Sequence, residues 1–166
     1  MTVSPINRIP VNALGCTCHP PGHHHRRTNV STSLLYLVKR TELAVRARLE
    51  ELVRPAGITA LQYTALTVLD RHDGISAAQL ARDSFVTAQT MADMVRALES
   101  RGLIRREPNP DNRRERLVLL TEAGKGLLDE YAGPARALEE RMVADLTPEE
   151  VDGFRQALQR TWRSLT

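Results

Sequence analysis

The side chains best suited to metal or redox chemistry are concentrated near the N-terminus. Both cysteines and four of the five histidines fall within ten residues: Cys16, Cys18, His19, His23, His24 and His25. Thiolates and imidazoles at this density could bind zinc or another soft or borderline metal, and the thiols could sense oxidants. However, structural zinc sites usually separate paired cysteines by about two to four residues, and here only one residue intervenes. The simplest alternative is a flexible tail in which these residues have no shared role.

The first 30 residues also differ in composition from the rest of the chain. They contain four prolines and few large apolar side chains, which predicts an N-terminal extension that is flexible or forms an extended arm. Three arginines and no acidic residue give this extension the whole net charge of +3. The other 20 basic residues are balanced by 20 acidic ones, so the pI of 9.2 does not by itself indicate nucleic-acid binding.

A second group of charged residues lies in a predicted hairpin. Residues 103–106 and 116–120 have strand character, and the prolines and asparagines between them predict a tight turn. The turn carries Asp111, Arg113 and Arg114, and Arg116 begins the second strand. Arginine is suited to bidentate phosphate contacts and to narrow minor grooves.

A helix, a sharp turn and a second helix precede this hairpin. Ser76 begins a Ser-x-x-Gln capping box, and Thr87 can cap the second helix, which Gly102 ends. Four apolar residues of the second helix share one face: Met91, Met94, Val95 and Leu98. A helix–turn–helix followed by a hairpin is a winged helix, which most often binds DNA.

Flanking helices must position this module. Apolar stripes predict helices over 31–54, 59–70, 121–145 and 147–166, so the fold class is mainly α with a small β-hairpin wing. The winged helix, 59–120, cannot cover the stripes of 31–58 and 121–166. We therefore expect these segments to be dimerisation helices of a domain spanning 31–166. The alternative is a monomer whose terminal helices pack only on its own winged helix.

Other protein classes are disfavoured by what the chain lacks. It contains no apolar run of the roughly 18–20 residues needed to cross a bilayer and no signal-peptide pattern, so we expect a cytoplasmic protein with no membrane partner. Residues 31–166 contain no nucleophile–base–orienter set, no glycine-rich phosphate loop and no metal-plus-acid constellation. We therefore expect that the protein is not an enzyme and requires no cofactor.

The residues from Phe85 to Ile104, with Asp111-x-Arg113 and the run from Leu117 to Gly124, resemble the MarR family of bacterial transcription regulators. The likeness covers residues 31–166, so the family implies no role for the Cys/His tail. It implies a homodimer, a recognition helix over 87–101 in the major groove of double-stranded DNA, and a wing in which Asp111 orients Arg113 into the minor groove. Arg114 and Arg116 are expected to contact phosphates or to form salt bridges with neighbours such as Glu115.

The exposed face of the expected recognition helix supplies the candidate base and phosphate contacts: Thr87, Ala88, Gln89, Thr90, Asp93 and Arg96. Gln89 is the best candidate to read a base, because its amide can pair bidentately with adenine. Asp93 is expected to orient Arg96 or to accept from a cytosine amine. Two such helices on one face of DNA predict a pseudo-palindromic operator with half-sites about 34–36 Å apart.

The resemblance also implies that a small phenolic or otherwise lipophilic acid acts as effector and releases a repressor from its operator. The candidate cleft residues are Tyr36, Arg40, Tyr63, Leu66 and His72. The alternative for each is an ordinary structural role, in the core or, for His72, in a solvated turn.

Two other functions remain open. The winged helix could serve as a protein-interaction module without specific DNA binding, although the basic wing tip favours DNA. The chain could also be a metal- or redox-responsive regulator that senses through its Cys/His tail.

Overall fold

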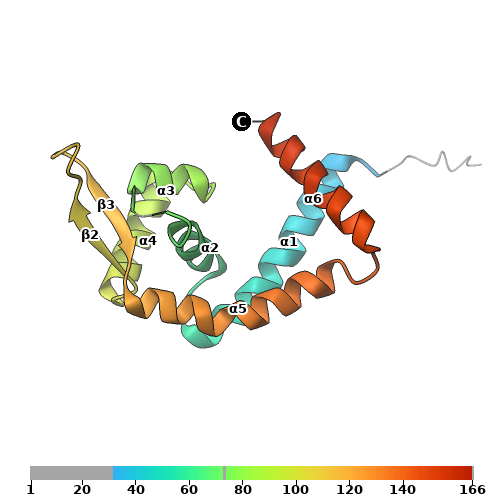
Figure 1. The fold of residues 1–166 in the computed structure, drawn as a ribbon, viewed down its shortest axis with the longest axis horizontal. Coiled ribbons are helices and arrows are strands. Elements are labelled where there is room, and N and C mark those ends of the chain that lie inside the picture. The colour runs from blue at the N-terminus through green and yellow to red at the C-terminus, as the bar shows by residue number, and fades with distance from the viewer. Residues whose placement is uncertain (1–31, 73, 166) are drawn as a thin grey trace, which may run out of the picture. The chain divides into compact units, whose positions relative to one another are not determined.

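The computed structural model describes residues 32–72 and 74–165 of a chain that divides into two units, Met1–Ser33 and Leu34–Thr166. The described helices and strands belong to the second unit (Figure 1). Their order is α1 (Leu34–Val53), a 3₁₀ turn η1 (Arg54–Ala56), α2 (Ala60–Leu69), β1 (Ile75–Ser76), α3 (Ala77–Asp83), α4 (Ala88–Ser100), β2 (Ile104–Pro108), β3 (Arg116–Leu120), α5 (Glu122–Met142) and α6 (Pro148–Arg163). This order confirms the predicted fold class. Within the described ranges, no helix has both the length and the apolar character of a membrane span.

Side-chain caps set where the helices begin. In each of five helices the N-cap side chain accepts a hydrogen bond from the third backbone amide of the helix; these caps are Thr59, Ser76, Thr87, Thr121 and Thr147. The capping boxes of Thr59 and Thr147 are closed in both directions.

The predicted box at Ser76 is only half formed. The Gln79 side chain bonds Asp83 and Arg82, its neighbours on α3, instead of returning to the Ser76 amide.

Three antiparallel strands form a sheet in the order β1-β3-β2. The predicted hairpin is present, with Ile104 opposite Leu120 and Pro108 opposite Arg116, so its first strand runs two residues further than expected. Strand β1 was not predicted. It has only two residues, Ile75 and Ser76, so its sequence cannot show the alternation of apolar and polar residues that predicts a strand. It is recognised only by its pairing with Val118 and Leu117 of β3.

The core joins the helix–turn–helix to the inner face of the sheet. Its fully buried large side chains come from the end of α1, from α2, α3 and α4, and from the sheet: Val53, Leu66, Leu69, Leu80, Met91, Leu98, Ile104 and Val118. All four apolar residues predicted on the inner face of α4 are buried. Apolar burial of this kind contributes about 25 cal/mol per Å², so this cluster holds α4 and the wing as one body.

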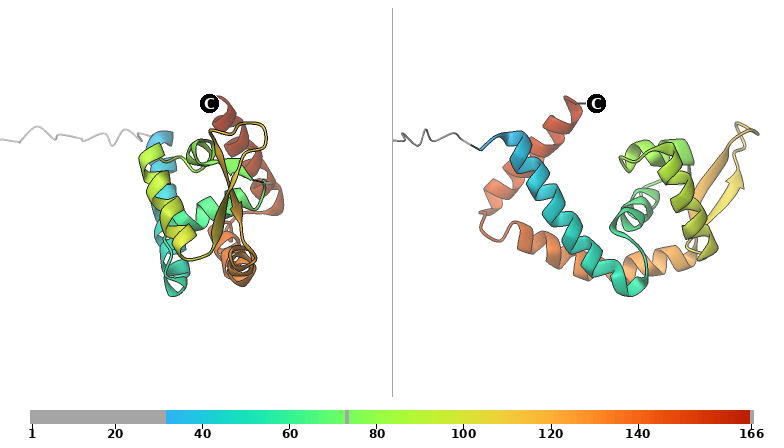
Figure 2. Two further views of the ribbon diagram at one scale, coloured as in Figure 1. Left: turned by 90° about the vertical axis from the view of Figure 1, so that its left-hand side faces the viewer. Right: turned by 180° about the vertical axis from the view of Figure 1, so that it is seen from behind.

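The terminal helices are covered far less. Helix α5 runs between the winged helix and the end of the unit where α1 and α6 lie (Figures 1 and 2). Over Leu34–Val53, α1 buries only Val53, and over the described residues Pro148–Arg163, α6 buries none. The predicted apolar stripes of these helices are therefore exposed in a single chain. Helix α5 ends at Met142, about one turn before the expected boundary, where Val143 takes up the C-cap.

Candidate nucleic-acid interface

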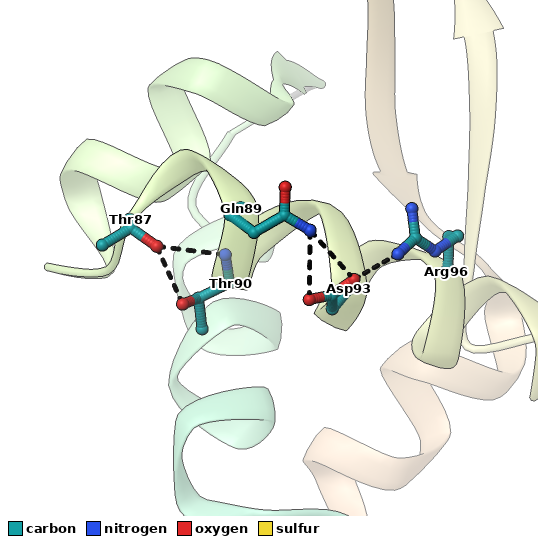
Figure 3. Close-up of polar contacts among 5 residues, drawn as sticks. All are labelled: Thr87, Gln89, Thr90, Asp93 and Arg96. Atoms are coloured by element: carbon teal, nitrogen blue, oxygen red, sulfur yellow. Dashed lines mark hydrogen bonds and ion pairs between the residues drawn. The ribbon is translucent and has the colours of Figure 1, made fainter.

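The N-terminal end of α4 presents two hydroxyl groups to solvent. The Thr87 hydroxyl accepts from the Thr90 amide at 3.1 Å, and the two hydroxyl groups share a hydrogen bond of 2.8 Å (Figure 3). Thr87 and the neighbouring Ala88 are exposed, and Thr90 is half-buried. Because a helix N-terminus carries partial positive charge, this end of α4 is suited to meet a phosphate.

The next turns of α4 carry a polar chain centred on Asp93. The Arg96 guanidinium donates to the Asp93 carboxylate in an ion pair, as expected from the sequence. The Gln89 amide also lies against this carboxylate, at 3.4 and 3.5 Å from its two oxygens (Figure 3). All three side chains are exposed, so the face presents an amide, a carboxylate and a guanidinium in a fixed order.

The wing tip is shaped by asparagines that sequence analysis had not assigned to the site. Asn109 Oδ1 accepts from the Asp111 amide at 2.9 Å, and Asn112 Oδ1 accepts from the Arg114 amide at 3.2 Å. Asn109 Nδ2 also donates to the Glu115 carboxylate at 2.9 Å. Side-chain hydrogen bonds of this kind, to the backbone amide two residues ahead, are typical of Asx turns. The asparagines in this proline-rich turn were therefore the sequence signal that could have predicted the role of Asn109 and Asn112.

Asp111, Arg113 and Arg114 are exposed at this tip. Among the ion pairs of residues 32–72 and 74–165, none joins Asp111 to Arg113. The family resemblance had implied that Asp111 orients Arg113. In the free protein the asparagines set the turn, and an exposed ion pair would add little, typically below about 1 kcal/mol.

A second missed contact joins the wing to α4. Arg106 of β2 donates through Nε to Glu99 Oε1 at 3.0 Å and through Nη2 to Glu99 Oε2. This bidentate bond lowers the pKa of the Glu99 carboxyl and raises that of Arg106. Arg116 donates to the Arg106 carbonyl at 2.9 Å, and not to Glu115 as one expectation had it.

Between α4 and the wing lies a groove of about 410 Å³ with a basic lining. Four of its lining residues are the arginines Arg96, Arg106, Arg114 and Arg116. The structure therefore brings Arg96 of the predicted recognition helix together with Arg114 and Arg116 of the predicted wing. Arg106, the fourth, was not predicted; its half-buried position beside α4 comes from strand register, which the sequence leaves ambiguous.

Comparison with known proteins agrees with this geometry. The model of the MarR family matches residues 58–115. The HTH-type transcriptional repressor Rv2887 of Mycobacterium tuberculosis is 30% identical over 125 residues, which cover 75% of this chain and 90% of Rv2887. The chain belongs to the MarR family. As a member of that family it is a DNA-binding transcription regulator with a winged helix–turn–helix, and it is not an enzyme.

Solved structures support the same family assignment. The salicylic acid complex of the M. tuberculosis MarR family protein Rv2887 has a TM-score of 0.65 and 29% identity, over 80% of this chain and 98% of that one. Apo MarR from Escherichia coli has a TM-score of 0.69 and 25% identity, over 78% and 96%.

The candidate effector residues of this MarR-family chain do not share one environment. Tyr63 and Leu66 belong to the hydrophobic core, where burial raises the pKa of the Tyr63 hydroxyl, with Glu139 adding to the rise. Tyr36 and Arg40 are exposed on α1. His72 lines a cavity of about 820 Å³ with Val68, Arg71, Gln79, Arg82, Asp83, Phe85 and Trp162.

The candidate metal ligands at positions 16–25 lie outside the described residues. In the part of the chain that is described, no group of three Cys, His, Asp or Glu side chains is placed to hold a metal ion. Zinc binding by the tail stays a prediction.

Proposed function

We propose that the protein is a homodimeric repressor that binds a pseudo-palindromic operator and is released by a small lipophilic acid. The observation that carries this proposal is the basic groove between α4 and the wing, beside the exposed Gln89–Asp93–Arg96 chain. Relatives of this chain are named transcriptional repressors, which supports that sign of regulation. A repressor of this kind works on the chromosome, so we also propose a cytoplasmic location.

The proposed path of the DNA backbone runs along this groove. When α4 enters the major groove and the wing tip reaches the adjacent minor groove, the sugar–phosphate strand that separates the two grooves must pass between them. Arg114 and Arg116 then lie on the wing side of that strand and Arg96 on the helix side. Each phosphate neutralised adds about one unit to the salt dependence of binding. Arg113, at the tip, is left to enter the minor groove.

A second copy of the chain is the proposed occupant of the apolar surface on α1 and α6. Leu34, Leu37 and Val38 of α1 line an apolar cavity of about 580 Å³ with Phe154 and Leu158 of α6. Apolar residues continue beyond it, with Leu35 84% exposed and Leu146 40% exposed. Helix α6 is well capped but has no fully buried residue in its own chain, so its apolar stripe needs a partner. Symmetric pairing of two such ends covers both stripes at once.

The proposed effector site is the cavity that His72 lines. Its lining residues include two arginines, two aromatic residues and one acidic residue: Arg71, Arg82, Phe85, Trp162 and Asp83. This mixture suits a small aromatic acid, whose carboxylate could pair with the arginines and whose ring could pack against the aromatic side chains. The relative Rv2887 has been crystallised with salicylic acid, which is an acid of this class.

Selection of duplexes from a random pool tests the proposal. Fluorescence anisotropy of the selected duplex would then be measured with salicylate, with zinc and with neither. We expect a pseudo-palindrome bound by two chains per duplex, and weaker binding when salicylate is added. An effect of zinc would show that the Cys/His tail takes part. Weak, sequence-independent binding would contradict the proposal and favour the protein-interaction module.

A further inference from the structure

The connector between α1 and α2 is fastened to the C-terminal end of the recognition helix. Arg101, the C-cap residue of α4, donates from Nη2 to the Ala56 carbonyl at 2.5 Å and from Nη1 to the Gly57 carbonyl. These two carbonyls lie at the end of the turn through which the chain passes from α1 into the winged helix. The Arg101 side chain therefore binds two residues that lie 44 and 45 positions earlier in the chain.

The connector is shaped for this contact. Gly57 has a φ of +67°, a left-handed conformation that side chains other than glycine rarely adopt, and its amide donates to the Arg54 carbonyl at 2.8 Å. A Cβ added at Gly57 would lie 3.1 Å from Arg101 Nη1. The glycine thus leaves room for the guanidinium to approach both carbonyls.

A contact from the dimerisation side holds the same connector. The Glu50 carboxylate, on α1, accepts from the Ala60 amide at 2.6 Å, at the start of α2. Glu50 of α1 and Arg101 of α4 therefore bind the same short connector, so a series of hydrogen bonds joins α1 to α4 through it. Arginine is suited to this role because its planar fork can serve two acceptors at once.

We propose that Arg101 is a positioning residue for DNA binding, a latch that transmits the placement of α1 to the recognition helix. This inference rests on the proposed homodimer. In such a dimer the two α1 helices belong to the shared interface, so a firm link from α1 to α4 holds the two recognition helices at one separation. The latch then sets the half-site spacing that the protein accepts.

Duplexes with altered spacing test this role. Inserting one base pair between half-sites moves one of them by about 3.4 Å along the helix. We expect the wild type to lose about 30-fold or more in affinity for that duplex. Arg101→Ala should lose less than about fivefold between the two spacings, while its melting temperature stays within a few degrees of wild type. A purely structural role would lower affinity for both duplexes equally and would keep the ratio.

Two further variants and a control make the result specific. Gly57→Ala adds a Cβ that would crowd the Arg101 guanidinium, so it should relax the spacing preference as Arg101→Ala does. Arg101→Lys keeps the charge but replaces the two-armed fork by a single ammonium group, so its spacing ratio should be intermediate. The control Arg48→Ala removes an exposed arginine that pairs with Glu51 on its own helix, and it should keep the wild-type ratio.

Hydrogen exchange separates failure of the latch from failure of the proposed function. The Gly57 amide donates to the Arg54 carbonyl within the connector, and the Ala60 amide donates to the Glu50 carboxylate of α1. Arg101→Ala should speed the exchange of both amides at least about fivefold whether or not DNA binds. Unchanged exchange, or an unchanged spacing ratio in a variant that binds DNA, would overturn the latch. If the wild type showed no preference for one spacing between half-sites, the homodimeric repressor would be contradicted instead. Hydrogen exchange of the connector amides would then be the test of the latch.

Discussion

Asp93 and Arg96 form an ion pair on the exposed face of α4, three residues apart, and Gln89 lies on the other side of the same carboxylate. The carboxylate thus holds both candidate DNA-contacting side chains before DNA arrives. In the proposed complex with DNA it would also repel phosphates, and this would disfavour binding wherever Arg96 and Gln89 find no matching base.

Replacing this carboxylate should exchange specificity for affinity. We expect Asp93→Asn to bind a scrambled duplex several-fold more tightly and to lose about tenfold in discrimination, since one well-formed base contact is worth about 1–3 kcal/mol. Anisotropy titrations on operator and scrambled duplexes measure both effects. Glu122→Gln breaks an exposed ion pair of the same spacing on α5, with Lys125 at 3.0 Å, and should change neither titration. Equal discrimination in Asp93→Asn and wild type would exclude this role.

The wing tip should contribute through Arg113. Arg113→Ala is expected to weaken operator binding by about 1–3 kcal/mol, and most strongly where the flanking base pairs are A·T, because narrow minor grooves attract guanidinium groups. Titration of duplexes with A·T or G·C flanks measures this. The control Arg136→Ala removes an exposed arginine of α5, outside the wing. A loss of affinity that does not depend on the flanks would assign Arg113 to phosphate contact.

The contact between Glu99 and Arg106 predicts a pH dependence. The pKa of Glu99 is lowered in the folded protein from 4.5, so the carboxylate contributes stability above that pH and loses it as the pH falls through the lower folded value. Glu99→Gln should therefore melt below wild type at neutral pH, and the difference should disappear well below pH 4.5.

Thermal denaturation across pH measures this difference. Glu107→Gln, which breaks an exposed pair within β2, is the matched control and should change the melting temperature less. A difference between Glu99→Gln and wild type that stays constant at acid pH would contradict the prediction.

Two glycines of α5 should respond oppositely to alanine. A Cβ at Gly124 would lie 2.2 Å from the Leu103 carbonyl oxygen, so Gly124→Ala must push α5 away from the start of the wing and should destabilise by about 1–3 kcal/mol. A Cβ at Gly126 meets nothing within 4 Å, so Gly126→Ala should be neutral or stabilise by up to about 1 kcal/mol. Chemical denaturation of the pair gives both values. The same sign for both would show that α5 does not need this close approach.

Phe85 should matter more to the effector than to the fold. Its backbone is left-handed, with a φ of +56°, and its side chain is 73% exposed in the wall of the cavity lined by His72. Phe85→Gly should raise stability by about 1 kcal/mol by relieving that backbone strain and should weaken salicylate binding severalfold. Calorimetric titration and melting measure the two effects. Unaltered salicylate affinity would place the effector elsewhere.

The features that sequence predicted well are those encoded locally. The threonine cap at position 87, the apolar face of α4 and the Asp93–Arg96 pair all depend on residues within one or two helical turns. The wing was predictable for the same reason, because its turn formers are contiguous.

Features missed by sequence depend on partners distant in the chain or on register. Arg101 reaches a connector more than 40 residues away, and Arg106 meets Glu99 only once the strand register is known. The effector candidates were chosen by residue type, and two of them, Tyr63 and Leu66, are buried in the hydrophobic core. Residue type alone cannot distinguish a buried tyrosine from one that lines a cleft.

In the proposed homodimer, the exposed apolar stripe of α6 would make this regulator's lifetime depend on its own abundance. Chains paired in that dimer would hide Phe154 and Leu158, whereas newly made or diluted chains would leave both exposed to proteases and chaperones. The cell would then clear unpaired copies fastest and keep the pool enriched in molecules able to occupy an operator. Quality control and gene control would act through the same sixteen-residue helix.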